Sequence, residues 1–311
     1  MSVHLFKRSP LADTSVSNPA VPLPGALDLL QHWARVCPLS SALRHKRRGH
    51  WYDWRWIDAL RDVQRLADGL RQQGVGARSR LVLSGPFQPD LLLLALAAQS
   101  VGAAVLSLGE GLGQVALCQA LWRLRPSHAF VPDGPPLQRW LAASASGPAP
   151  RLLTFAALLG AREPPRRWTL RWRPAAGSQL WSEEGSEWPD GLKVVLQQWL
   201  HSGHSLAFPE RRDSADRDRR EVAPSGLLLS APGLQRLAEA VDTRLGPAGH
   251  WRRRLWQWAN ARPRGPLQRL IGHRMRRALG LQRLHDLWQA PGGAERPWAS
   301  PWLAGLKRNI P

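Results

Sequence analysis

Residues 51–108 read WYDWRWIDALRDVQRLADGLRQQGVGARSRLVLSGPFQPDLLLLALAAQSVGAAVLSL, and this stretch decides the fold. Apolar residues recur every three or four positions in its first third, which predicts one buried face of a helix. These positions are Ile57, Leu60, Val63, Leu66 and Leu70. Asp53 is the expected N-cap of that helix, and Gly74 and Gly76 are the residues expected to end it.

The rest of the stretch predicts a strand, a helix and a second strand. Residues 81–83 are a short apolar strand, residues 90–101 an apolar helix and residues 103–106 another strand. Two short strands joined by a buried helix form a βαβ unit with parallel strands. A membrane-spanning helix is the alternative for the apolar run 91–108, but glutamine, serine and glycine interrupt that run.

The composition combines an ordinary apolar content with a strong positive charge. In 311 residues, 43 Lys and Arg stand against 23 Asp and Glu, which gives a formal net charge of +20. A surface this basic attracts anionic partners, whether nucleic acid, acidic lipid or acidic protein. Cys37 and Cys118 match no metal or redox spacing, which favours a reduced, cytoplasmic setting and no metal centre.

Composition shifts divide the chain into four predicted parts. Residues 1–25 are a flexible leader without the apolar core of a signal peptide. Residues 26–132 are a first lobe around the βαβ unit, and residues 133–179 are a linker rich in Pro, Ala and Gly. Residues 180–311 are a second lobe.

Local patterns predict further elements within the two lobes. Residues 114–124 are expected to form a helix and residues 127–131 a strand, which extend the first lobe. The dense mixed-charge run ERRDSADRDRRE at 210–221 is interpreted as a solvated loop or helix face. A helix with regularly spaced apolar residues follows between Leu234 and Leu245.

Several blocks stand in an order and at a spacing that resembles the AMP-forming (adenylate-forming) acyl-CoA synthetase family. They are LADGL at 66–70, GVG at 74–76, RLV at 80–82, VGAAV at 101–105, VAPSGLLLSAP at 222–232, WRRRLWQWA at 251–259 and RRALGLQRL at 276–284. The resemblance covers residues 50–131 and 222–311 and is to the N-terminal adenylation domain of long-chain members. It leaves out the family's later motifs and its C-terminal domain, so a truncated, degenerate relative is expected. An unrelated α/β domain is the alternative.

The resemblance implies an α/β fold of two incomplete lobes, with parallel-rich sheets flanked by helices. Members of the family hold the phosphates of ATP in a loop of the form TSGTTGxPKG, where backbone N–H groups and hydroxyls face the anion. The nearest segment here is SEEGSEWPDG. The expected relics of the phosphate loop are Ser182, Ser186, Pro189 and Gly191.

Acidic residues have entered this segment. It contains Glu183, Glu184 and Glu187, and Asp190 stands where the family has lysine. Each carboxylate held close to a polyphosphate costs about 1 kcal/mol or more. In a second alignment, residues 181–208 are a later helix and strand, and the phosphate loop is deleted. Both alignments predict a lost phosphate site, so no cofactor is expected unless activity with ATP and Mg²⁺ is retained.

A glycine-rich turn in the last part of the sequence corresponds to the family's adenine-contacting turn, with an ordinary turn as the alternative. It consists of Gly292, Gly293 and Ala294. Two other motifs are weaker. The sequence GEGLG at 109–113 departs from the dinucleotide-binding pattern and is expected to be a plain loop. His201 and His204 lack an acidic or cysteine partner nearby and are expected to be a solvated pair, not metal ligands.

Basic residues gather in the stretch 251–277. The candidate anion-binding residues are Arg252, Arg253, Arg254, Arg274, Arg276 and Arg277. Trp251, Leu255 and Trp258 form an apolar stripe beside them. This combination fits an anionic membrane surface, or a nucleic-acid backbone with tryptophan stacking. A core stripe with a solvated arginine face is the third interpretation.

Together these patterns favour a catalytically silent relative of the acyl-CoA synthetases that binds an acyl ligand or a protein of a lipid pathway. A second hypothesis is a basic module that binds nucleic acid or an anionic membrane surface. A third is an enzyme completed by a separate chain that supplies the missing half. The expected location is the cytoplasm, with peripheral contact to the inner face of the membrane.

Overall fold

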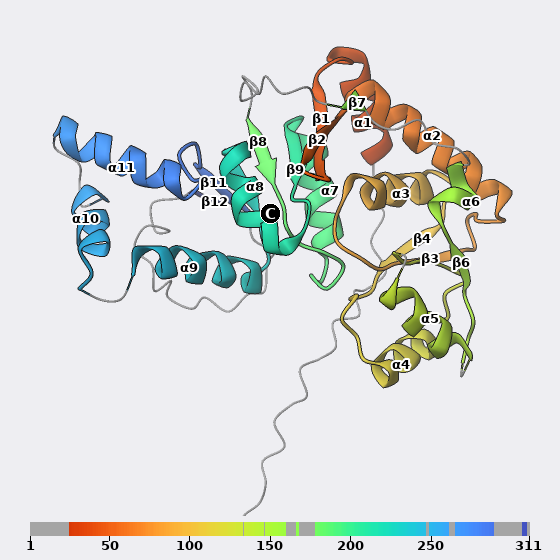
Figure 1. Cartoon of the computed structure of the whole chain (residues 1–311). Helices are drawn as coiled ribbons and strands as arrows, with labels where there is room; N and C mark the ends of the chain where they lie inside the picture. Colours follow the sequence, from red (N-terminus) through yellow and green to blue (C-terminus); the bar gives the residue numbers. More distant parts are fainter. Residues whose placement is uncertain are drawn as a thin grey trace, which may run out of the picture.

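Two β-sheets form the frame of the molecule (Figure 1). The computed structural model describes residues 25–132, 134–145, 147–159, 166–167, 178–246, 249–260, 265–288 and 307–309. The small sheet contains, in order, β4 (Ala104–Ser107), β3 (Arg80–Leu83), β5 (His128–Phe130) and β6 (Arg151–Leu153). All four strands are parallel.

The large sheet is mixed. It contains, in order, β12 (Lys307–Asn309), β11 (Asp286–Trp288), β10 (Gly226–Leu228), β8 (Gln179–Trp181), β9 (Ser205–Phe208), β1 (Ser41–Arg47), β2 (His50–Arg55) and β7 (Arg166–Arg167). The strands from β12 to β1 are parallel, whereas β2 is antiparallel to both β1 and β7.

Helices cover both sheets. They are α1 (Ala26–Val36), α2 (Trp56–Gln72), α3 (Pro89–Ser100), α4 (Gln114–Leu124), α5 (Pro135–Ala145), α6 (Phe155–Leu159), α7 (Gly191–Ser202), α8 (Ala215–Val222), α9 (Ala231–Leu245), α10 (Trp251–Asn260) and α11 (Pro266–Ala278). A short 3₁₀ helix, η1 (Arg212–Ser214), precedes α8. The α/β fold class predicted from the sequence is confirmed.

The βαβ unit predicted from residues 51–108 is present. Helix α3 joins β3 to β4, and these strands are parallel, with Leu81 opposite Val105. The helix predicted at 114–124 is α4, and β5 occupies the middle of the strand predicted at 127–131. Helix α2 is followed by Gly74 at a φ of 81°, a conformation that favours glycine and ends helices.

Successive residues of each strand point to opposite faces of its sheet, so both sheets have helices on both faces and the molecule has five layers. In β8, Leu180 belongs to a central core and Trp181 to an outer one. In β3, Leu81 belongs to the same central core, whereas Val82 belongs to a second outer core. Helices α1, α2, α3 and α7 therefore lie between the two sheets. Helices α8 and α9 cover the outer face of the large sheet, and α4 and α5 cover that of the small one.

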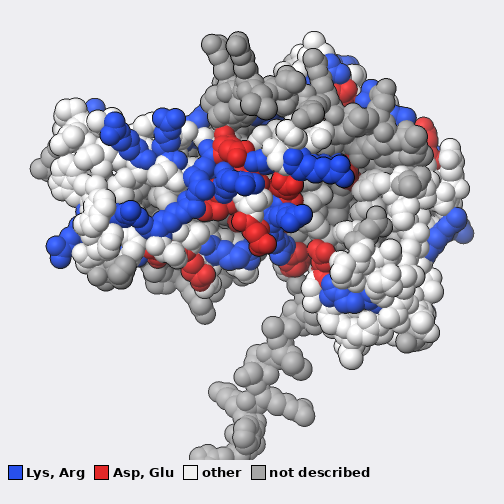
Figure 2. Space-filling model, in the orientation of Figure 1, with Lys and Arg blue, Asp and Glu red and all other residues white. Residues whose placement is uncertain are grey.

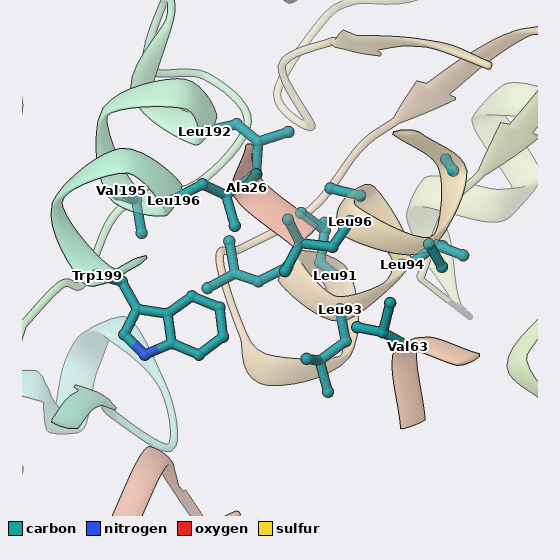
Figure 3. Packing of buried hydrophobic residues seen from close by; sticks show 14 of the residues in the cluster. Ala26, Val63, Leu91, Leu93, Leu94, Leu96, Leu192, Val195, Leu196 and Trp199 are labelled. Carbon is teal, nitrogen blue, oxygen red and sulfur yellow. The ribbon is translucent and has the colours of Figure 1, made fainter. Parts of the chain in front are cut away.

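Helix α3 lies at the centre of this arrangement and is buried on almost every side. Figure 3 shows its Leu91 and Leu96 beside Leu196 and Trp199 of α7. A helix that is apolar all round requires such a central position. The Trp199 ring stacks on Trp56 of α2 with centroids 5.3 Å apart, which fixes α7 against α2. No helix in the described ranges has both the length and the apolar content to cross a membrane.

The predicted N-cap of α2 is wrong. Asp53 lies within β2, where its carboxylate accepts a hydrogen bond from Ser41 and pairs with Arg44 at 3.5 Å. Helix α2 begins directly after β2, and Asp58 accepts from the backbone N–H of Arg55 at 3.3 Å. The segment before the helix is extended because it pairs with β1, a partner that lies outside the quoted stretch.

The hairpin formed by β1 and β2 connects the two predicted lobes. β1 and β2 come from the first predicted lobe, yet β1 pairs with β9 of the large sheet, with Leu43 opposite Leu206. β7 comes from the predicted linker and joins the outer edge of β2. The division into four parts stays a prediction, and the pairing places residues 41–55 in the large sheet.

The interpretation of residues 210–221 as a solvated charge run is wrong for its central residues. Asp218 and Arg219 of α8 are buried, and Lys46 of β1 donates to Asp218 at 2.8 Å and to Glu221 at 2.6 Å. Burial alone raises the pKa of Asp218, but hydrogen bonds from Lys46 and from nearby groups bring that pKa below its ordinary value. Lys46 of β1 lies 172 residues from Asp218 in the sequence, and its hydrogen bond to Asp218 holds α8 against the large sheet.

Candidate functional site

Two loops that follow β3 and β8 are joined by hydrogen bonds. The backbone N–H of Gly85 donates to Ser186 Oγ, and the N–H of Ser186 donates to the carbonyl of Gly85, both at 2.9 Å. The N–H of Phe87 donates to the carbonyl of Glu184 at 2.9 Å. We call these two loops, residues 84–88 and 182–190, the seam. Loops at the carboxyl ends of parallel strands are the usual places for binding sites in α/β folds.

The side-chain carboxylate of Glu184, a residue of the seam, lies at the N-terminus of α9. Its Oε1 atom accepts from the backbone N–H of Ser230 at 3.0 Å and from the Ser230 hydroxyl at 2.9 Å. Ser230 is the N-cap of α9 and also accepts from the N–H of Gly233. A Cβ atom at position 233 would collide with the Glu184 carboxylate, so glycine is required there. An internal carboxylate thus occupies the positive end of this helix.

The other two glutamates of the seam also have partners within the chain. Trp181 Nε1 donates to Glu183 at 3.2 Å, and Arg219 lies 4.0 Å from the same carboxylate. Burial raises the pKa of Glu183 above its ordinary value. Glu187 forms an ion pair with Arg212. The three glutamates predicted to repel a polyphosphate are therefore structural partners of α8, η1 and α9.

The expected relics of a phosphate loop have different positions. Ser182 and Ser186 are buried, and the Ser186 hydroxyl is used in the seam. Pro189 is exposed, and Gly191 begins α7 against the ring of Trp188. The predicted adenine turn lies outside the described residues. A role of these residues in binding a nucleotide stays a prediction.

A pocket of about 550 Å³ opens beside the seam, at the carboxyl ends of β3, β5 and β6. Its apolar wall contains Pro86, Leu91, Phe130 and Phe155, and its polar groups include Asp90 and Thr154. Asp90 forms an ion pair with Arg47 of β1 at 2.5 Å. Mostly apolar walls with a few polar groups are typical of small-molecule sites. The sequence patterns did not reveal this pocket, although Pro86 lies only three residues after the predicted strand 81–83.

The described residues of the predicted basic stretch form α10 and most of α11. Trp251 and Trp258 are 63% and 44% exposed, whereas Trp256 is only 5% exposed. The interpretation of Trp251 and Trp258 as core residues is therefore wrong. Arg253 donates to Asp242 and to the carbonyl of Gly246, both at 3.0 Å. The other candidate arginines are exposed, and they are Arg252, Arg254, Arg274, Arg276 and Arg277.

Figure 2 shows Lys and Arg side chains gathering over the end of the molecule formed by α8 to α11. Acidic side chains on this face concentrate closer to its middle. Residues 109–113 form a loop, as predicted, and the described part of the chain contains no cluster of His, Cys, Asp and Glu arranged for a metal ion. His201 is exposed, as predicted, whereas His204 is half-buried, so the predicted solvated pair is correct for His201 alone.

Solved structures with a similar fold include VinN, an acid ligase and an acetoacetyl-CoA synthetase. VinN in complex with L-aspartate is similar with a TM-score of 0.59 and 13% identity, over 95% of this chain and 76% of that one. Acetoacetyl-CoA synthetase from Streptomyces lividans has a TM-score of 0.58 and 13% identity, over 90% and 50%. Coronafacic acid ligase from Pectobacterium brasiliense has a TM-score of 0.58 and 10% identity, over 72% and 53%.

These similarities establish the fold alone, because the sequence identities are low. The fold is that of the N-terminal domain of adenylate-forming ligases. The chain spans about half to three quarters of the length of these solved structures. No protein-family model matches the sequence, and no curated protein sequence matches it. Membership of a long-chain subgroup and truncation stay predictions.

Proposed function

We propose that this chain is a ligase-like protein that binds an acyl group, or a protein carrying one, without forming an acyl-adenylate. The observation that carries the proposal is the position of Glu184. Forming an adenylate requires a site for the phosphates of ATP, and such sites use helix N-termini and cationic side chains. At α9 the N-terminal donors already bind the Glu184 carboxylate.

The charges around this position support the same conclusion. A phosphate placed at the seam meets Glu183, Glu184 and Glu187 within one short loop. Arg212 and Arg219 face that loop, but each is paired with one of its carboxylates. A polyanion has to displace these internal partners before it gains contacts of its own. Binding of ATP at the seam is therefore expected to be weak.

The pocket at the carboxyl ends of β3, β5 and β6 is the proposed acyl site. Leu91, Phe130 and Phe155 provide an apolar wall suited to a hydrocarbon chain. Asp90 at the pocket is paired with Arg47, so a neutral acyl thioester is favoured over a free carboxylate there. Contacts with a lipid-pathway protein, an anionic membrane or nucleic acid stay predictions.

Two measurements test the proposal. The first is exchange of pyrophosphate into ATP in the presence of Mg²⁺ and dodecanoate, with the full chain. We expect no exchange above the rate without dodecanoate. Exchange that increases with dodecanoate concentration would overturn the claim that the chain forms no acyl-adenylate.

The second measurement is binding of a neutral dodecanoyl thioester by calorimetry. Thr154→Trp introduces a large ring at the rim of the pocket and is expected to weaken binding about tenfold, which corresponds to roughly 1.4 kcal/mol. Val115→Trp places the same ring on α4, where Val115 is exposed and away from the pocket lining, and serves as the control. Equal binding by both variants and the wild type rules out this pocket as the acyl site.

A further inference from the structure

A second pocket, of about 390 Å³, lies where α8, α9, α10 and α11 meet. We call it the arginine pocket. Its charged lining is Arg220 from α8, Arg244 from the last turn of α9 and Arg252 from the first turn of α10. Its apolar lining includes the buried Leu245 and Leu279 and the half-buried Met275. None of these residues lines the proposed acyl pocket.

Positive charge exceeds negative charge at this pocket. Asp216 forms ion pairs with Arg219 and Arg244 and lies 3.5 Å from Arg220. One carboxylate is thus shared by three guanidinium groups. Arg219 also pairs with Glu183, whereas Asp216 is the one carboxylate among the described residues that pairs with Arg220 and Arg244. A single additional anion at the pocket would relieve this imbalance.

Arg252 gives an independent indication of an anionic ligand. It lies in the first turn of α10, the positive end of the helix, where a cation is electrostatically unfavourable. Its guanidinium lies 5.4 Å from the centroid of the Trp251 ring. Among the described residues, no carboxylate forms an ion pair with it. An arginine held at such a position, beside two others, is suited to receive a negatively charged group.

We propose that the arginine pocket binds an amphiphilic anion, that is, an acyl or alkyl chain with a carboxylate or phosphate head. The head contacts Arg252 and Arg244 at the rim, and the chain lies on Leu245, Leu279 and Met275. A polyphosphate without a chain leaves the apolar lining uncovered, and an uncharged chain leaves the arginines without a new partner. The same chemistry is offered by a free amphiphile and by a lipid head group in a membrane.

The first test is titration of the full chain with monomeric dodecyl phosphate, using calorimetry. Arg252→Gln is expected to weaken binding about tenfold through the loss of one charge-assisted contact. Arg254→Gln removes the same charge two residues along α10, from an exposed position outside the pocket lining, and is expected to change binding less than about twofold. Arg252→Lys retains the charge but not the planar guanidinium, and is expected to bind more weakly than the wild type and more tightly than Arg252→Gln.

Three results would overturn the proposal. These are an absence of dodecyl phosphate binding, equal weakening by Arg252→Gln and Arg254→Gln, and binding of dodecanol or inorganic phosphate as tight as that of dodecyl phosphate. Equal weakening, together with loss of single-stranded DNA binding in both variants, would assign the arginines to a nucleic-acid surface instead.

A vesicle assay separates the two sources of the ligand. Vesicles of phosphatidylcholine with phosphatidylglycerol are sedimented with the wild type and the two glutamine variants. Sedimentation that depends on Arg252 but not on Arg254 supports the proposal with a membrane lipid as the source. Binding of monomers without sedimentation supports it with a free amphiphile. Sedimentation that depends equally on both arginines contradicts the pocket and indicates diffuse attraction to the membrane.

Discussion

Helices α9 and α10 begin in opposite electrostatic surroundings. The N-terminus of α9 is capped by Ser230 and closed by the buried carboxylate of Glu184. The N-terminus of α10 has His250 Nδ1 as an acceptor for the N–H of Arg252, and three consecutive arginines follow Trp251. The donors of the first helix end are satisfied by the chain itself. The second has the wrong charge for its own dipole, which leaves a use for an external anion.

The largest expected effect on stability comes from removing the Glu184 carboxylate from the N-terminus of α9. Glu184→Ala removes a charged acceptor from two buried donors of Ser230, and should lower the free energy of unfolding by about 3 kcal/mol. Glu239→Ala changes an exposed glutamate of the same helix and should cost less than about 0.5 kcal/mol. Urea denaturation measures both. Similar losses in the two variants would mean that Glu184 does not close this helix end.

The second-largest expected effect is a pH dependence of stability that arises from the buried His45 of β1. Burial, with a smaller effect of the neighbouring Arg47, lowers the pKa of His45 to about 3 from its ordinary 6.5. The unfolded chain therefore binds a proton that the folded chain excludes, and stability is lost as pH falls below 6.5. Between pH 7.5 and pH 5 this residue should cost about 2 kcal/mol of unfolding free energy.

His45→Gln isolates this contribution from that of the carboxylates. It retains polar atoms for the hydrogen bond from Arg47 Nε, which lies 3.0 Å from His45 Nδ1, but it does not titrate. The difference in stability between pH 7.5 and pH 5 should therefore be smaller in this variant than in the wild type. An unchanged difference would assign the pH dependence to other groups.

The smallest expected effect tests the α10 end directly. Arg252→Glu places a carboxylate in the first turn of α10, which should raise the free energy of unfolding by about 0.5 kcal/mol. The same change should abolish dodecyl phosphate binding, so stability and binding move in opposite directions. Arg254→Glu is the matched control for charge. Thermal melts at low salt measure the stability, and a destabilised Arg252→Glu variant would contradict the comparison of the two helix ends.

Sequence patterns predict those helices and strands that depend mainly on residues close to one another in the sequence. The βαβ unit follows from a short apolar strand, an apolar helix and a second strand, and α4 was predicted with its observed bounds. The N-cap at Asp53 failed because pairing with β1 keeps this residue extended. A strand partner overrides a local capping preference, since several ladder hydrogen bonds outweigh one cap.

The site was harder to predict because its partners are distant in sequence. The acidic character of residues 182–190 was visible, but the contact of Glu184 with Ser230 joins positions 46 residues apart. The burial of Asp218 depends on Lys46 in the same way. Charged residues in a mixed run resemble a solvated surface until the fold places a counter-charge beside some of them. The arginine pocket, which needs four helices to meet, had no local signal beyond its arginines.

The parallel pairing of β1 with β9 has a consequence for biosynthesis. The β1–β2 hairpin leaves the ribosome before β9, which covers the inner edge of β1 and lies more than 150 residues later in the sequence. During that interval the nascent chain presents an open strand edge next to the apolar residues of α2 and α3. The β1 edge therefore stays unpaired until β9 has been synthesised, and formation of the large sheet is expected to be slow because it depends on this long-range pairing.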